Sequence, residues 1–266
     1  MKSTSLKRHR KRVAKTSPST PRIIDLVRRT CKGFIELRRV KAFIGRNELI
    51  GGLASMGVLS VLVLILCEKE ESGSSPSFTS TQPEQSGYRK AQHLMQLAHK
   101  FNLPIVVFTA SSVSLPGMDT TKPHEAASFT KHLVSQQHFG SPMILVVLNR
   151  RNSGEIFGGW FAHKVIAFEQ ARFLMTIMDQ GSHCHVQVGT KILLSYGIID
   201  RVVPELLGGG HHSCSAIAMQ LRSALTEMLC ELSQLSPEDL RDRRREKIER
   251  VSAFSSQERG WGDRLV

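Results

Sequence analysis

The sequence lacks the short motifs that mark several common classes of enzyme. Its 266 residues contain no Walker-type phosphate loop, no G-x-G-x-x-G fingerprint and no G-x-S-x-G nucleophile elbow. No combination of serine, histidine and aspartate stands out as a catalytic triad. If the chain is an enzyme, we therefore expect it to stabilise an oxyanion with main-chain amides of its loops, without a side-chain nucleophile.

Cysteine is scarce, and its spacing does not indicate a structural framework. The five cysteines are odd in number, lie far apart and form no C-x-x-C pair, which indicates free thiols in a reducing compartment. Residues 183–185 (His-Cys-His) and 211–212 (His-His) raise the question of a metal site. Because neither group forms a C-x-x-C or H-x-x-x-H pair, we expect no metal in this chain.

Most of the chain has no excess of charge of either sign. The whole formal net charge of +13 lies in residues 1–46, which hold 15 Lys and Arg and 2 acids, whereas the remaining 220 residues hold 21 of each sign. A basic folded surface for nucleic acid is therefore not indicated. Residues 1–21 contain no acid and are predicted to be a disordered arm, either an organelle transit peptide or a solvated tail.

One uncharged run of 19 residues, 49–67, has two interpretations. As a helix it would span a bilayer, and the basic residues before it would keep the N-terminus inside. Against this, Gly51, Gly52 and Gly57 interrupt the run, and residues 58–66 are rich in Val, Leu and Ile, as in a strand buried on both faces of a sheet. We therefore expect a buried strand–turn–strand.

The rest of the chain alternates helical and strand patterns, which predicts a layered α/β fold. Residues 87–101 are predicted to form a helix, and a buried strand over 105–108 follows Pro104. Residues 68–86 are predicted to be a mobile loop and residues 255–266 a tail. The other expected elements are short amphipathic helices in 23–37 broken near Gly33, helices at 125–139 and 216–232, strands at 143–148, 164–168 and 173–178, and a last helix opening at Ser236.

The order of several short segments carries a resemblance to one family. FIEL at 34–37, IGGLA at 50–54, GYRKA at 87–91, GIID at 197–200 and LSQLSPEDLRDRRREKI at 232–248 follow one another along the chain. In this succession the chain resembles the alpha subunit of the bacterial and plastid acetyl-CoA carboxylase carboxyltransferase over residues 22–254. The resemblance implies one α/β domain with a crotonase-like fold, a spiral of ββα units, in which 49–67 is a buried strand pair.

The resemblance also implies an activity and partners. The reaction transfers a carboxyl group from carboxybiotin to acetyl-CoA to form malonyl-CoA, the first step of fatty acid synthesis, in the plastid stroma or the bacterial cytoplasm. The implied partners are a zinc-bearing beta subunit and a biotin carboxyl carrier protein, in an α2β2 assembly without nucleic acid or membrane. Biotin is held by the separate carrier, so this subunit is expected to bind acetyl-CoA as substrate and no cofactor of its own.

Two loops are the expected catalytic site. By the resemblance, the main-chain amides of Ser153 and Gly154 are oxyanion donors, and the turn at Pro116 and Gly117 shapes the same site. Both loops follow predicted strands, where α/β folds place their ligands. Negative charge develops on the ureido oxygen of biotin and on the acetyl enolate, and fixed N–H donors stabilise such charge.

The start of the predicted helix at 87–101 carries a basic pair. Arg89 and Lys90 are the expected substrate-binding residues, because cations at a helix N-terminus suit the phosphates or a carboxylate of a CoA substrate. A solvated basic pair is the alternative for these two residues.

The chain departs from the family in the loops that should carry catalysis. In the glycine-crowded loop at 149–156 only Ser153 and Gly154 keep the family pattern, and residues 110–114 and 68–86 also differ from it. Two hypotheses remain: an active alpha subunit, and a catalytically impaired scaffold or regulatory homologue that still binds the beta subunit.

Overall fold

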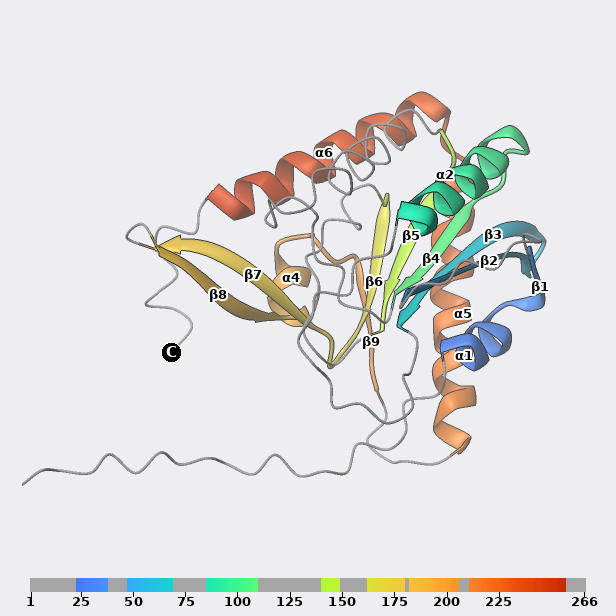
Figure 1. Cartoon of the computed structure of the whole chain (residues 1–266), viewed down its shortest axis with the longest axis horizontal. Helices are drawn as coiled ribbons and strands as arrows, with labels where there is room; N and C mark the ends of the chain where they lie inside the picture. The colour runs from blue at the N-terminus through green and yellow to red at the C-terminus, as the bar shows by residue number, and fades with distance from the viewer. Residues whose placement is uncertain are drawn as a thin grey trace, which may run out of the picture.

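The computed structural model describes residues 23–37, 47–68, 85–109, 140–148, 162–179, 182–205 and 211–256. Within these ranges, seven strands form one sheet in the order β1-β2-β3-β4-β5-β6-β9, and β7 and β8 form a separate ribbon that projects from it (Figure 1). The strands are β1 (Lys32–Glu36), β2 (Asn47–Met56), β3 (Leu59–Glu68), β4 (Ile105–Thr109), β5 (Met143–Val147), β6 (Lys164–Phe168), β7 (Arg172–Asp179), β8 (Ser182–Gly189) and β9 (Arg201–Val203). The helices are α1 (Ile23–Thr30), α2 (Gln85–Lys100), α4 (Thr190–Ser195), α5 (His211–Ser233) and α6 (Pro237–Ser256).

Parallel strands form the centre of the sheet. β3 pairs with β4, β4 with β5, and β5 with β6, all in parallel. Every residue of β4 and β5 is buried, and a strand covered on both faces needs apolar side chains at every position. The unbroken apolar runs in the sequence thus have a physical cause, and the strands predicted at 105–108 and 143–148 are confirmed.

The uncharged run at 49–67 forms an antiparallel hairpin. β2 and β3 pair in continuous register from Asn47 opposite Glu68 to Met56 opposite Leu59. Gly57 occupies the turn with φ of +63°, a backbone conformation that side chains other than glycine rarely adopt. The predicted strand–turn–strand is confirmed. Among the described helices, none has the length and apolar character needed to cross a membrane.

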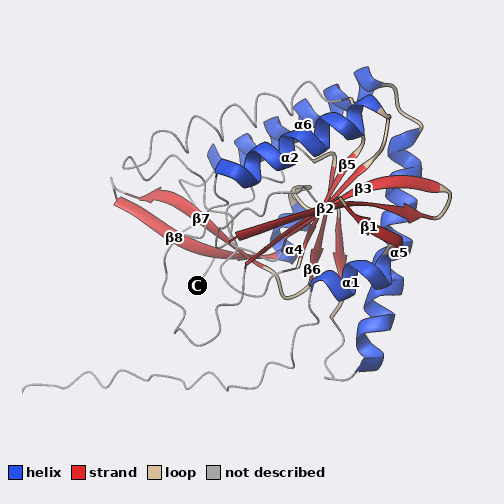
Figure 2. Cartoon of the chain, turned by 45° about the vertical axis from the view of Figure 1, so that its right-hand side comes forward, coloured by secondary structure: helices blue, strands red, loops and turns tan. Residues whose placement is uncertain are grey.

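Side chains alternate between the two faces of the sheet and form two cores. On one face Val63, Val106 and Ile144 pack with α1 and α5. On the other, Leu64, Val107 and Leu145 pack with α2 and with residues around α4. Figures 1 and 2 show α1 and α5 together beside the sheet, apart from α2. The fold is therefore three layers, with the parallel strands in the middle.

The segment 23–37 differs from the prediction of one or two short amphipathic helices broken near Gly33. Its first part is α1, but residues 32–36 form β1, an edge strand antiparallel to β2. Gly33 lies inside β1 with φ of +62°, where the register with β2 shifts between Lys32 and Ile35. The Leu37 N–H donates to the Gly51 carbonyl at 2.8 Å. Pairing with the β2 edge thus outweighed the local helical pattern.

A side chain from α5 secures the end of α1. Arg222 Nε donates to the Thr30 carbonyl at 2.7 Å, and Nη2 of the same guanidinium donates to the Arg29 carbonyl. The last carbonyls of a helix have no partners within the helix. Arg222 supplies the donors and so fixes α1 to α5.

The last two helices were predicted well. The helix expected at 216–232 begins earlier, at His211. Ser236 caps α6, because its hydroxyl accepts from the Asp239 N–H at 3.1 Å while the Asp239 carboxylate accepts from the Ser236 N–H at 3.2 Å. This reciprocal arrangement is a capping box, so the start of the last helix is confirmed.

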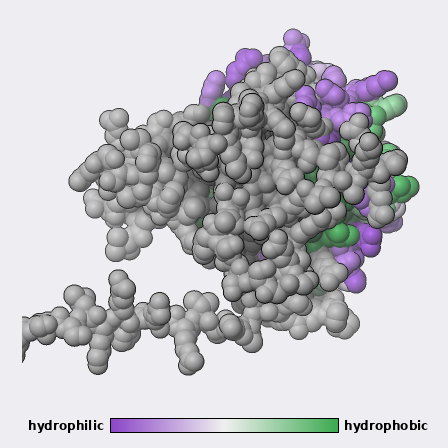
Figure 3. Space-filling view, viewed as in Figure 1, coloured by the Kyte–Doolittle hydropathy of each residue, from purple (hydrophilic) through white to green (hydrophobic). Residues whose placement is uncertain are grey.

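The exposed large hydrophobic residues of the described surface lie on different elements. Figure 3 shows hydrophobic and hydrophilic residues interspersed where the described surface faces the viewer. The exposed residues include Ile35 on β1, Val58 in the β2–β3 turn, Phe101 after α2 and Met219 on α5. Single exposed apolar residues of this kind are normal for a protein surface.

Gly52 is where β2 meets β1 most closely, so the substitution Gly52→Ala should destabilise the fold. A Cβ there would overlap the Ile35 carbonyl oxygen and lie 2.6 Å from Phe34 Cε2. The main-chain oxygen cannot move without disturbing the β1–β2 pairing, and we expect a loss of about 2–3 kcal/mol in urea unfolding.

Gly189→Ala is the matched control, because a Cβ there has no atom within 4 Å. Its change should stay below about 1 kcal/mol. Equal effects of the two substitutions would contradict the close approach of β1 to Gly52.

Candidate functional site

The predicted loops leave the sheet side by side. Leu66, Thr109 and Val147 are register partners across β3, β4 and β5. The Leu148 N–H donates to the Thr109 carbonyl at 2.9 Å, so the pairing continues to the last residue before the loop that starts at 149. Because parallel strands end at one edge, the bases of the loops that start at 110 and 149 are neighbours at the carboxyl edge, where α/β folds bind ligands.

The loop residues themselves lie outside the described part of the chain. Pro116, Gly117, Ser153 and Gly154, predicted from the sequence, fall in 110–139 and 149–161, which are not among the described ranges. The structure therefore places the strands from which both loops depart, and the roles of these four residues stay predictions.

The basic pair lies in the first turns of α2, beside the same edge. Arg89 belongs to the helix, and its side chain is outside the described set. Lys90 Nζ donates to the Leu49 carbonyl at 2.7 Å, and Leu49 is the register partner of Leu66. Lys90 is thus attached to the row of residues from which the predicted loops depart.

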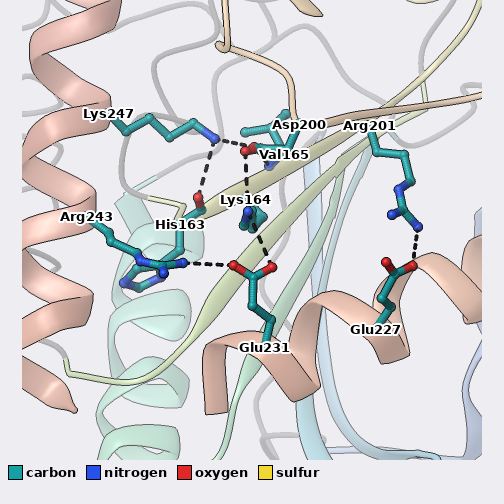
Figure 4. Close-up of polar contacts among 9 residues, drawn as sticks. All are labelled: His163, Lys164, Val165, Asp200, Arg201, Glu227, Glu231, Arg243 and Lys247. Atoms are coloured by element: carbon teal, nitrogen blue, oxygen red, sulfur yellow. Dashed lines mark hydrogen bonds and ion pairs between the residues drawn. The ribbon is translucent and has the colours of Figure 1, made fainter. Parts of the chain in front are cut away.

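A polar cluster that the sequence did not reveal lies at the opposite, amino edge (Figure 4). Asp200, just before β9, accepts from the Val165 N–H at 2.7 Å and from Lys247 Nζ at 2.5 Å. Lys247 belongs to α6 and is only 4% exposed at its side chain. Burial lowers the pKa of Lys247, and the Asp200 carboxylate opposes that shift. One carboxylate therefore joins β6, β9 and α6.

Glu231 extends this cluster to α5. Its two carboxylate oxygens lie 3.5 Å from Lys164 Nζ and 2.8 Å from Arg243 Nη1. The hydrogen bond from Arg243 is the main cause of a lowered pKa at Glu231, with Lys164 adding to it. Arg201 and Glu227 form a further, exposed pair at 2.7 Å. The C-terminal helices are thus connected through ion pairs to the starts of β6 and β9.

His163 is the buried histidine of the cluster, 5% exposed. Its Nδ1 accepts from the Met143 N–H at 2.9 Å, and Arg244 Nη2 lies 3.2 Å from its Nε2. Burial first, and then the Arg244 charge, lower the pKa of His163 from 6.5 to about 3. Arg244 is itself buried, which lowers its pKa to about 10. A ring held neutral between a main-chain donor and a guanidinium serves structure, because it is not available to exchange protons near neutral pH.

The α6 part of this cluster is hard to recognise from the sequence, because its buried face includes two cations. Leu240, Arg244 and Lys247 recur at helical spacing and are buried, although two of them are cations. From the sequence alone, a helix face of this composition is interpreted as exposed to solvent.

Within the described residues, no group of three or more His, Cys, Asp or Glu side chains is arranged to hold a metal ion.

Comparison with known proteins bears on the whole chain. A family model described as acetyl co-enzyme A carboxylase carboxyltransferase-like matches residues 4–252. The acetyl-coenzyme A carboxylase carboxyl transferase subunit alpha of Exiguobacterium sibiricum is 27% identical over 248 residues, which cover 88% of this chain and 79% of that protein. The likeness therefore extends over most of this chain and about four fifths of that protein.

Solved structures bear on the fold. The chain resembles transcarboxylase 12S with a TM-score of 0.53 and 17% identity, over 79% of this chain and 40% of that one. It resembles a probable enoyl-CoA hydratase from Mycobacterium smegmatis with a TM-score of 0.50 and 14% identity, over 77% and 87%. At these identities the likeness concerns the fold alone, and it confirms the crotonase-like α/β class predicted from the sequence.

Removing the charge of Asp200 should destabilise the protein. Asp200→Asn keeps the shape of the side chain but leaves the buried Lys247 ammonium without its carboxylate. Because Asp200 is 22% exposed, we expect a loss of about 2–4 kcal/mol in urea unfolding at pH 7, somewhat below that of a fully buried pair. Glu227→Gln breaks an exposed ion pair of the same neighbourhood and should leave the unfolding midpoint nearly unchanged. A similar loss in both variants would contradict the role of burial.

His163 should make stability depend on pH below neutrality. In the unfolded chain the ring takes a proton as the pH falls through 6.5, whereas the folded ring stays neutral until about 3. Acid therefore favours the unfolded chain in this range, and we expect His163 to lower stability by about 2 kcal/mol between pH 7 and pH 5.

The measurement is urea unfolding at both pH values. His163→Asn keeps an acceptor for the Met143 N–H but does not titrate, so it should lose this part of the pH dependence. His93→Asn, at an exposed histidine of α2, should retain it. An unaltered pH dependence in His163→Asn would contradict the assignment.

Proposed function

The chain belongs to the acetyl co-enzyme A carboxylase carboxyltransferase-like family, and from that membership we propose that it is the alpha subunit of an acetyl-CoA carboxylase carboxyltransferase. It transfers a carboxyl group from carboxybiotin to acetyl-CoA, and the product is malonyl-CoA. One observation carries the proposal beyond membership. The predicted donor loops depart from adjacent residues at one edge, with the Leu148 N–H bonded to the Thr109 carbonyl.

The chemistry explains why adjacent loop bases matter. Removing the carboxyl group from biotin leaves negative charge on the ureido oxygen, and acetyl-CoA must form an enolate before it can accept the group. Both charges are stabilised by N–H donors that are fixed before the reaction. In this proposal the Ser153 and Gly154 amides face one of these charges, and the turn at Pro116 and Gly117 shapes the surroundings. The rigid centre of the sheet holds both loops at their bases.

The substrate and the partners follow from the same proposal. In this proposal the start of α2, which carries Arg89 and Lys90, binds the anionic groups of acetyl-CoA. A beta subunit completes the site in an α2β2 assembly, and a biotin carboxyl carrier protein delivers the carboxybiotin. This subunit holds no cofactor of its own, and the complex works in a bacterial cytoplasm or a plastid stroma.

The test is to co-express the chain with a carboxyltransferase beta subunit and measure malonyl-CoA formation from acetyl-CoA and carboxybiotin. Gly154→Pro removes one N–H donor and should lower kcat by about 10²–10³-fold. Ser55→Ala, at an exposed position of β2, is the control and should keep the wild-type rate. Normal assembly with background turnover in the wild type would instead support a scaffold or regulatory homologue.

A further inference from the structure

Lys90 donates a hydrogen bond to the main chain of β2, at the Leu49 carbonyl. β2 is bordered by β1 on its outer side, and the Leu37 N–H donates to the Gly51 carbonyl at 2.8 Å. In an extended strand, carbonyls two residues apart point to the same side. The Leu49 carbonyl therefore continues this row toward the carboxyl edge, and its donor at 2.7 Å is Lys90 Nζ. Within the described residues, a side chain of α2 thus donates to the same side of β2 as the Leu37 N–H of the neighbouring segment.

The same face of α2 contacts β2 one turn further along. Leu94 lies four residues after Lys90, and residues with this spacing share one face of a helix. Leu94 is buried and lies so close to Gly51 that a Cβ on the glycine would overlap its Cδ1 atom. Two contacts, one polar at Lys90 and one apolar at Leu94, thus hold α2 against Leu49 and Gly51 of β2.

These contacts fix the position of α2 relative to the strand ends at which the predicted loops begin. Leu49 pairs with Leu66 in β2–β3, and Leu66 pairs with Thr109 in β3–β4. The Lys90 ammonium and the departure point of the loop at 110 therefore belong to one transverse row of the sheet. A shift of α2 along β2 would change the separation between the helix start and both loops.

We propose that Lys90 is a positioning residue for carboxyl transfer, which sets the start of α2 relative to the carboxyl ends of β4 and β5 through the Leu49 carbonyl. The inference rests on the proposed function. It deepens that function by giving Lys90 a role within the protein, as the donor to the Leu49 carbonyl. The other groups at the helix start then contact the substrate. A substrate held at one end by α2 and at the other by the loops loses rate when the two ends are misplaced.

The experiment uses the complex with the beta subunit and the variants Lys90→Met, Lys90→Arg and Lys100→Met. Lys90→Met keeps an unbranched side chain but removes the donor, whereas Lys90→Arg keeps a donor for the Leu49 carbonyl. Lys100→Met makes the same change at an exposed lysine at the end of the same helix. We expect Lys90→Met to lower kcat about tenfold or more, with KM for acetyl-CoA within about twofold of wild type. Lys90→Arg should recover most of the rate, and Lys100→Met should match the wild type.

Hydrogen exchange gives a readout that does not depend on turnover. In Lys90→Met, amides in the first turns of α2 and near Leu49 should exchange faster, with no change in Lys100→Met. A raised KM with unchanged kcat and unchanged exchange would overturn the inference and identify Lys90 as a direct substrate contact. An inactive wild-type complex would overturn the proposed function, and the exchange measurement would still decide whether Lys90 anchors α2.

Discussion

The main-chain ladder through β3, β4 and β5 is the constraint on which the rest of the structure depends. Both faces of these strands are buried under apolar side chains, so their N–H and C=O groups find partners only in neighbouring strands. A shift in this ladder would leave buried groups unpaired and move every side chain of a strand to a new environment. The ladder therefore fixes where each strand ends, and with it the places where the following loops begin.

The two edges of this rigid sheet have different contacts. At the carboxyl edge, Thr109 and Leu148 are bonded to each other and bring together two loops that are far apart in the sequence. At the amino edge, Asp200 and His163 are engaged by α6, and the buried Lys247 ammonium there faces the Asp200 carboxylate. Burying cations is costly unless carboxylates and main-chain oxygens face them. The contacts at this edge therefore hold α6 in one register, whereas the loops predicted to carry catalysis begin at the carboxyl edge.

The sequence predicted the parts of the fold whose pattern and environment agree. The glycines at 51, 52 and 57 distinguished a hairpin from a membrane helix, and the register of β2 with β3 confirms it. The sequence around Ser236 and Asp239 predicted the start of α6, because a capping box involves only residues that are close together in the chain. The strand β1 was mistaken for helix, since its pairing partner, β2, lies beyond a stretch of chain that local periodicity does not connect to it. The cluster around His163 was missed for a related reason, because its members come from β6, β9, α5 and α6.

By itself this sequence determined the family and the layered α/β class, because the order of segments, the periodicity and the turn glycines can all be read along the chain. Only the tertiary structure decided which strand ends are neighbours, that Lys90 bonds to the Leu49 carbonyl, and that a helix rich in arginine buries Arg244 and Lys247. The physical reason is that a hydrogen bond or an ion pair depends on distance in space. Residues such as His163 and Arg244 acquire their environment only when the strands and helices that carry them pack together.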